Sequence, residues 1–165
     1  MNFIDNMKKP PVFLCDLMLR RLARWLRILG IGCVYAGDEG ISDDDEILKF
    51  CLKRGCVLLT RDELLYRKAG SYVKTVLMDN ESPERQVKAL TGKFGLKLCR
   101  KFLGPSLCPQ CGGRLERVGK PSVKGKVFPK VYELNRSFNK CADCGKIYWK
   151  GSHFPKLESF HKKVA

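Results

Sequence analysis

Four cysteines form two pairs, each with two residues between its members and a glycine directly after it. The pairs are Cys108 with Cys111 and Cys141 with Cys144, and 29 residues separate them. Two such knuckles supply four thiolates for a tetrahedral Zn²⁺ site, and the glycines permit the tight turns that follow them. Neither pair has the strand-to-helix setting of a thioredoxin-type redox motif. The spacing predicts a closed, structural zinc site with no open position for chemistry.

Acidic residues follow three short apolar runs in the first half of the chain. In chain order they are Asp16, Asp62 and Asp79. If the runs are parallel strands of one sheet, their carboxyl ends meet at the same edge. Carboxylates gathered there remain ionised at low cost only around a cation, and hard oxygen ligands suit Mg²⁺ or Mn²⁺. We therefore predict a metal site able to activate water for phosphodiester hydrolysis.

A fourth candidate, Asp44, lies in the acidic run at residues 43–46. It precedes three apolar positions of a predicted helix by three, four and seven residues, so it lies on the face that packs toward the sheet. The other acids of the run are explained equally well as charges favoured by the helix dipole, with Ser42 or Asp43 as the cap. The strand-end acids have a similar alternative as turn or cap residues.

Basic residues lie close to these acids and between the two knuckles. After Asp16, three arginines follow one helical stripe at spacings of four and three residues, where they are placed to hold backbone phosphates. A solvated helix face is the alternative. The predicted nucleic-acid-binding residues are Arg20, Arg24, Arg27, Arg61, Lys124 and Lys126.

The composition limits the class of protein. The chain has 165 residues, with 32 Lys plus Arg against 17 Asp plus Glu and a net charge of +15. This excess favours a polyanionic partner, with nucleic acid ahead of an anionic membrane surface. No apolar run reaches the roughly 20 residues that span a bilayer, and the first residues lack the apolar stretch of a secretion signal. We expect a soluble, cytoplasmic protein whose nine cysteines form no disulfide scaffold.

Short apolar runs alternate with segments of helical period in the first half. The expected strands are residues 12–15, 33–36, 56–60 and 73–78, and the expected helices are residues 17–29, 43–54, 63–68 and 83–94. This order predicts an α/β fold in which helices cover both faces of a parallel sheet.

The chain changes character at residues 104 and 105, where Gly and Pro interrupt the pattern. The part before this point carries a charge of +6, and the part after it carries +9 and both cysteine pairs. Residues 127–134 and 147–149 are expected strands of a small β-rich zinc ribbon. We therefore divide the chain into residues 1–103 and residues 104–165.

Five segments together resemble the Mut-seven C-terminal ribonuclease domain family. They are residues 13–30, 42–48, 58–65, 108–113 and 141–153. The resemblance implies a PIN-like nuclease fold joined to a zinc ribbon and metal-dependent cleavage of RNA. It also implies that Asp16, Asp44 and Asp62 hold the catalytic Mg²⁺ or Mn²⁺, with Asp79 as a further candidate.

Two alternatives to a metal-dependent ribonuclease stay open. One is a noncatalytic RNA-binding or ribosome-associated protein with the same fold. The other is a receiver-like phosphoacceptor domain, which needs a lysine at a late strand end, whereas Lys74 precedes the apolar core of its strand. A ribonuclease that uses histidine as general acid and base is disfavoured because the first half contains no histidine.

Overall fold

The computed structural model of the chain describes residues 11–99 and 106–165. The predicted boundary at residues 103 and 104 lies outside the described residues. The elements of the first part are β1 (Phe13–Cys15), α1 (Arg20–Ile28), β2 (Cys33–Tyr35), α2 (Asp44–Arg54), β3 (Val57–Thr60), α3 (Glu63–Gly70), β4 (Thr75–Leu77) and α4 (Pro83–Phe94). The elements of the second part are β5 (Leu115–Val118), α5 (Pro129–Leu134), β6 (Phe138–Cys141), β7 (Ile147–Trp149) and α6 (Phe154–Val164).

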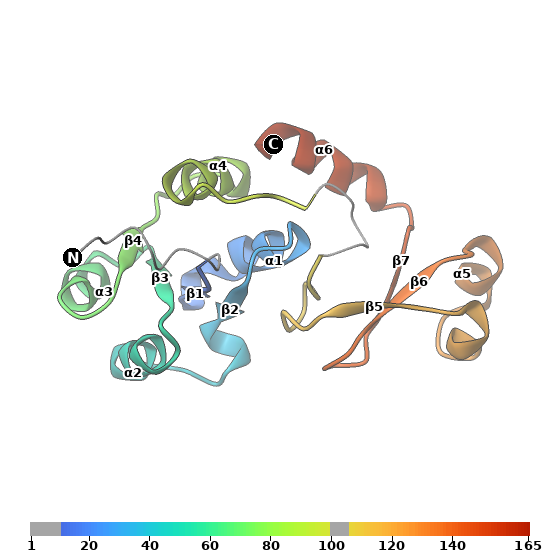
Figure 1. Ribbon diagram of the computed structural model, residues 1–165, viewed down its shortest axis with the longest axis horizontal. Coiled ribbons are helices and arrows are strands. Elements are labelled where there is room, and N and C mark those ends of the chain that lie inside the picture. Colours follow the sequence, from blue (N-terminus) through green and yellow to red (C-terminus); the bar gives the residue numbers. More distant parts are fainter. Residues whose placement is uncertain (1–10, 100–105) are drawn as a thin grey trace, which may run out of the picture.

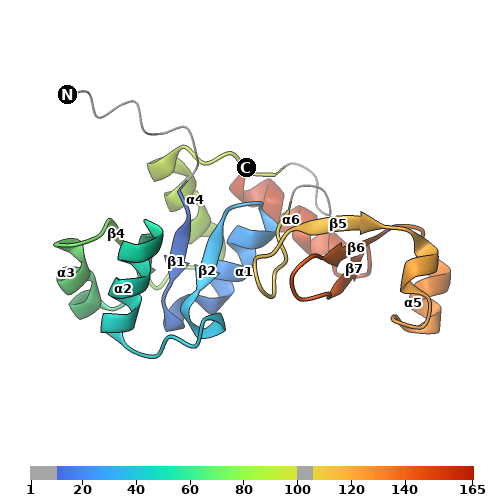
Figure 2. The same cartoon turned by 60° about the horizontal axis from the view of Figure 1, so that its bottom comes forward.

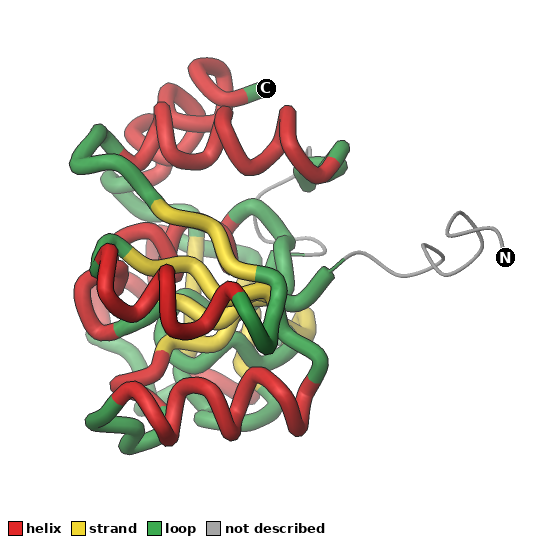
Figure 3. The backbone as a smooth tube through the Cα atoms, turned by 90° about the vertical axis from the view of Figure 1, so that its left-hand side faces the viewer, coloured by secondary structure: helices red, strands yellow, loops and turns green. Residues whose placement is uncertain are grey.

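The strands of the first part form a parallel sheet in the order β2-β1-β3-β4. Successive residues of a strand face opposite sides of the sheet. Phe13 accordingly joins the core beneath α1 and α4, and Leu14 joins the core beneath α2 and α3. Figure 3 shows the helices on both sides of the strands. The predicted parallel sheet with helices on both faces is confirmed.

Local sequence signals set the limits of α2. The carboxylate of Asp43 accepts the N–H of Glu46 at 2.8 Å, and the carboxylate of Glu46 accepts the N–H of Ser42 at 3.0 Å. Asp43 is thus the N-cap of α2, and Glu46 binds the backbone of the residue before the cap, in a variant of the capping box. The helix ends at Gly55, which has a φ of 64° that favours glycine. Within the described residues, no helix is long and apolar enough to cross a membrane.

The second part contains an antiparallel sheet in the order β5-β6-β7. The predicted strand at residues 147–149 is confirmed as β7. The predicted strand at residues 127–134 is wrong, because this segment forms α5 instead. Pro129 has no N–H for a strand ladder but fits the first turn of a helix. The large apolar side chains of Phe128 and Leu134 are exposed, so they do not mark a buried strand.

The last helix, α6, returns to the first part of the chain. Its residues Phe160 and Val164 are buried in the same core as α1 and α4. The ring of Phe160 stacks on Trp25 of α1, with the centroids 3.5 Å apart and an angle of 3° between the planes. In Figure 1, α6 lies beside α4 and above α1. The C-terminal helix therefore completes the core on one face of the parallel sheet.

Replacement of Phe160 by alanine should lower the free energy of unfolding by about 3 kcal/mol, because it removes a buried ring and its stacking contact with Trp25. Urea unfolding followed by circular dichroism measures this change. Phe128→Ala is the matched control, since its ring is 80% exposed, and it should unfold like the wild type. Equal stability of the two variants would contradict the packing of α6 described above.

Candidate functional site

Asp16 lies at the carboxyl end of β1 and is almost fully buried. One carboxylate oxygen accepts the N–H of Met18 at 2.9 Å, which caps a short 3-10 turn. The other oxygen accepts the hydroxyl of Thr60, at the end of β3, and the N–H of Arg61 at 3.2 Å. Asp16 is thus held by two neighbouring strands at the same edge of the sheet.

Burial raises the pKa of Asp16 above its usual value, although its hydrogen bonds from Thr60, Met18 and Arg61 lower that pKa. The negative charge of Asp62 adds to the increase. The carboxylate of Asp16 therefore holds its charge less readily in the folded protein than in water. A bound cation would remove this penalty, so the environment of Asp16 fits a metal ligand.

Asp62 is coupled to Asp16 through Thr60. The N–H of Asp62 donates to the Thr60 hydroxyl oxygen at 2.9 Å, and that hydroxyl donates to Asp16. The Asp62 side chain is exposed and caps α3, where one oxygen accepts the N–H groups of Leu64 and Leu65 at 2.7 and 3.0 Å. Capping uses one carboxylate oxygen and leaves the other oxygen of Asp62 to face solvent or an ion.

The acidic run at the start of α2 divides into distinct roles. Asp43 caps α2, Glu46 accepts the N–H of Ser42, and the carboxylate of Asp45 lies 2.7 Å from the Lys68 ammonium. This hydrogen bond and the charge of Lys68 lower the pKa of Asp45. Asp44 is partly buried and accepts no hydrogen bond from the described residues. Among residues 43–46, Asp44 is therefore the acid that makes no capping hydrogen bond and no ion pair with the described residues.

Asp79 follows β4, on the strand next to β3. Its side chain is exposed, and its backbone carbonyl accepts the side-chain amide of Gln86 at 2.8 Å. The four strand-end and helix acids are Asp16, Asp44, Asp62 and Asp79. Within the described residues they are not gathered closely enough for three ligand atoms to lie within 4.8 Å of one another.

The four knuckle cysteines do converge. The side chains of Cys108, Cys111, Cys141 and Cys144 place their sulfur atoms within 4.8 Å of one another. The distances from Cys108 to Cys144 and from Cys111 to Cys141 are 3.7 and 3.5 Å. A tetrahedral site with Zn–S bonds of about 2.3 Å has sulfur–sulfur edges of about 3.8 Å. These cysteines are positioned to hold a metal ion, and the spacing is consistent with zinc.

The surroundings of the first knuckle act differently on its two cysteines. Burial disfavours the charge on Cys108, but the Tyr148 hydroxyl at 3.0 Å and backbone N–H groups lower its pKa to about 7. Burial and the neighbouring thiols raise the pKa of Cys111 to about 12. Four thiolates in this space require a cation among them.

The comparison with protein families covers both parts of this structure. A family model described as the Mut7-C RNAse domain matches residues 11–161. The chain belongs to this family. No curated protein and no solved structure matches it. The predicted family is therefore confirmed, and its description indicates a nuclease-type function with RNA as the substrate.

In this Mut7-C RNAse domain, Arg27 is a structural link. Its side chain is 2% exposed, and its guanidinium lies 2.9 Å from the carboxylate of Asp38. It also donates to the carbonyls of Cys33 and Gln110, each at 2.9 Å. Gly112 makes this approach possible, since a Cβ there would lie 3.2 Å from Arg27 Nε and the residue has a φ of +81°. Arg27 therefore joins the sheet to the first cysteine knuckle.

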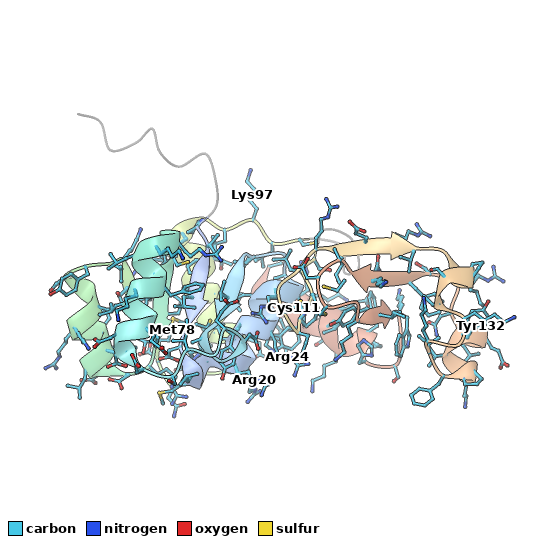
Figure 4. All side chains as sticks on the ribbon, turned by 90° about the horizontal axis from the view of Figure 1, so that it is seen from below. Arg20, Arg24, Met78, Lys97, Cys111 and Tyr132 are labelled. Carbon is cyan, nitrogen blue, oxygen red and sulfur yellow. The ribbon has the colours of Figure 1, made fainter. Side chains whose placement is uncertain are left out.

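The other basic residues predicted to bind nucleic acid lie at the surface, except Arg61, which is partly buried. Arg20 and Arg24 are exposed on α1, and Figure 4 shows them near each other on the underside of the molecule. They line a small hollow beside the first knuckle, at Pro109 and Gln110. Lys124 and Lys126 lie farther away, in the loop that precedes α5, and both are exposed.

Sequence reasoning overlooked two residues that organise these sites. Thr60 joins Asp16 and Asp62, and the signal for it in the sequence is its position at the end of a buried strand, two residues before Asp62. Tyr148 contacts the sulfur of Cys108. It lies in the predicted strand after the second knuckle, but nothing in the local pattern shows that its hydroxyl faces the cysteines.

Replacement of Arg27 by alanine in this Mut7-C RNAse domain should lower the free energy of unfolding by about 3 kcal/mol. The substitution removes one partner of a buried ion pair and leaves Asp38 and backbone carbonyls without their donor. It should also speed the loss of metal from the knuckles to a chelator, measured with a colorimetric zinc indicator. Arg24→Ala, on the exposed side of the same helix, is the control and should change neither quantity. Unaltered stability in Arg27→Ala would contradict the linking role.

Proposed function

We propose that the chain is a ribonuclease of PIN-like fold that depends on Mg²⁺ or Mn²⁺. The observation that carries the proposal is the coupled pair of Asp16 and Asp62 at the carboxyl edge of the sheet. Ligands and substrates of open α/β sheets bind at this edge. The nuclease unit is residues 1–103, and the ribbon unit is residues 104–165, with α6 packed back on the first unit. A cytoplasmic location stays a prediction.

The proposed metal ligands are Asp16, Asp44 and Asp62, with Asp79 at the next strand end. Mg²⁺ keeps several water ligands and binds through one or two carboxylates, so direct contact with all four acids is not required. When bound, the ion would activate a water and neutralise a phosphate oxygen. Thr60 holds Asp16 in one orientation, and the cap at α3 does the same for Asp62.

The ribbon is proposed to hold structural Zn²⁺ through its four cysteines. Arg20 and Arg61 are the proposed phosphate contacts nearest the acids, since α1 begins at Arg20, four residues after Asp16, and the N–H of Arg61 donates to Asp16. Arg24, Lys124 and Lys126 are further proposed contacts. Arg27 is not retained among them, because its donors are directed at groups inside the protein.

A noncatalytic RNA-binding protein is the second candidate. The observation in its favour is the spread of the acids, which do not converge as the cysteines do within the described residues. Both candidates predict RNA binding that weakens as salt is added. Cleavage that requires a divalent ion separates them.

The acids should be essential for cleavage. We expect Asp16→Asn and Asp62→Asn each to lower kcat on RNA by about a hundredfold or more, because each removes charge that holds the metal. The assay follows single-stranded and structured RNA with Mg²⁺ or Mn²⁺ added to protein that retains its zinc.

The run at the start of α2 offers a matched control for this assay. Asp44→Asn should lower kcat, whereas Asp45→Asn removes the same charge one residue away, at the ion pair with Lys68, and should stay active. Equal activity of wild type, Asp16→Asn and Asp62→Asn would contradict the nuclease mechanism.

Added Mg²⁺ should stabilise the wild type through Asp16. Because the folded pKa of Asp16 is raised, its ionisation at neutral pH costs stability that would be fully present at low pH. A divalent ion bound by the carboxylate would offset this cost. Asparagine has no such charge, and its amide would face the N–H of Arg61, so the Tm of the variant Asp16→Asn is compared with and without Mg²⁺ rather than with that of the wild type. Added Mg²⁺ should raise the Tm of the wild type and leave that of the variant unchanged. An unchanged wild-type Tm would contradict binding of Mg²⁺ by Asp16.

A further inference from the structure

A cleft of about 580 Å³ lies between α1, α6 and the part of the ribbon that contains the first knuckle and β7. One wall is α1, from Arg21 to Ile28, and another is β7 with the residues before it. The helix α6 supplies a third wall. In Figures 1 and 2, α1 lies between the parallel sheet and the ribbon, and α6 crosses near both. None of the four proposed catalytic acids is among the described residues that line the cleft.

The lining of the cleft is strongly basic. Its described Lys and Arg residues come from three different elements or their flanking loops, and they are Arg21, Arg24, Lys146, Lys156 and Lys163. Glu84 is the one acid among the described lining residues, and the charges of Lys163 and Arg21 help to lower its pKa, after a backbone hydrogen bond. Positive charge converging from separate elements on a concave surface favours a polyanion.

The cleft also contains both tryptophans of the chain, Trp25 and Trp149. Each ring is partly exposed. Trp25 is fixed by its stacking on Phe160, so its orientation is set before any ligand arrives. Fixed aromatic rings beside Lys and Arg are the combination that binds unpaired bases by stacking and their backbone by charge.

Two helices that line the cleft, α1 and α4, each begin four residues after a strand-end acid. For α4, which lines the cleft at Glu84, that acid is Asp79. Arg24 lines both the cleft and the hollow that it shares with Arg20. Along an α-helix these two arginines are about 6 Å apart. A strand bound at the acids therefore has a basic path along α1 into the cleft.

We propose that this cleft binds a single-stranded segment of RNA next to the segment that is cleaved. This inference rests on the proposed ribonuclease function. Lys146 and Lys156 hold phosphates from two different walls, and Trp149 and the face of Trp25 that Phe160 does not cover stack on the bases. The volume lies in the range of small-ligand pockets, about 300–1,000 Å³, so the cleft takes one or two nucleotides and excludes a duplex.

Intrinsic tryptophan fluorescence tests this directly, because both tryptophans line the cleft. A short single-stranded oligoadenylate is titrated into the zinc-loaded protein without Mg²⁺ or Mn²⁺, so that no metal-dependent cleavage occurs. We expect saturable quenching. In the double variant Lys146→Glu, Lys156→Glu the Kd should rise about tenfold or more, since two phosphate contacts become repulsive.

The matched control is Lys140→Glu, Lys162→Glu, which makes the same change in net charge at exposed positions on β6 and α6 outside the lining. This variant should bind with a Kd within about threefold of the wild type at moderate salt. Both double variants must keep the wild-type Tm and zinc content. Equal weakening of binding in the two variants would overturn the proposal. Equal quenching by duplex RNA of the same length would also overturn it.

Cleavage kinetics separate this inference from the proposed function. If RNA is cleaved, the cleft variant should show a raised KM with an unchanged kcat, whereas Asp16→Asn should show a lowered kcat with unchanged quenching. Quenching that is lost in the cleft variant, without any cleavage by the wild type, would support the cleft and overturn the nuclease. Cleavage with equal KM in the wild type and the cleft variant would overturn the cleft alone.

Discussion

The buried charge of Arg27 fixes how the two parts of the molecule meet. A guanidinium removed from water is costly unless its donors are satisfied. Here they are satisfied by Asp38, by the carbonyl of Cys33 at the sheet edge and by the carbonyl of Gln110 in the first knuckle. The backbone adds a second link, since the N–H of Leu107 donates to the carbonyl of Arg27 at 2.8 Å. Relative movement of sheet and ribbon would therefore leave buried polar groups unpaired.

This constraint gives the cleft its fixed walls. One side of α1 is held to the knuckle by Arg27, and another side is held to α6 by the stack of Trp25 on Phe160. The cleft lies between these two attachments. The four knuckle cysteines are positioned to hold a metal ion, and a cation would offset the repulsion among their thiolates. A metal bound by the cysteines would thus stabilise a surface that it does not touch.

The features that could be predicted from the sequence are those that depend on residues close together in the chain. The strands around Leu14 and Leu58, the cap at Asp43 and the cysteine pairs follow from patterns a few residues long. The burial of Arg27 could not be predicted, because its helical spacing matches that of Arg20 and Arg24 while its hydrogen-bond partners lie 6 and 83 residues away. The helix α5 was missed because its apolar residues resemble a strand, although Pro129 favoured a helix start. The division of the acidic run among cap, ion pair and Asp44 depends on Lys68, which lies on another helix.

The acids and the basic residues lie on two different surfaces, the edge of the sheet and the cleft. The proposed cleavage of RNA and the proposed binding of RNA therefore depend on different residues. Near the carboxyl edge of the sheet, Asp16 and Asp62 oppose the approach of a phosphate until a cation is bound. On the proposed role of the cleft, its basic walls attract a phosphate with or without that cation. On the proposed function, RNA is therefore held first by the cleft and by Arg24, and the divalent ion determines whether the strand can also enter the acidic edge. The helix α1 joins the two surfaces, since it begins beside Asp16 and forms one wall of the cleft.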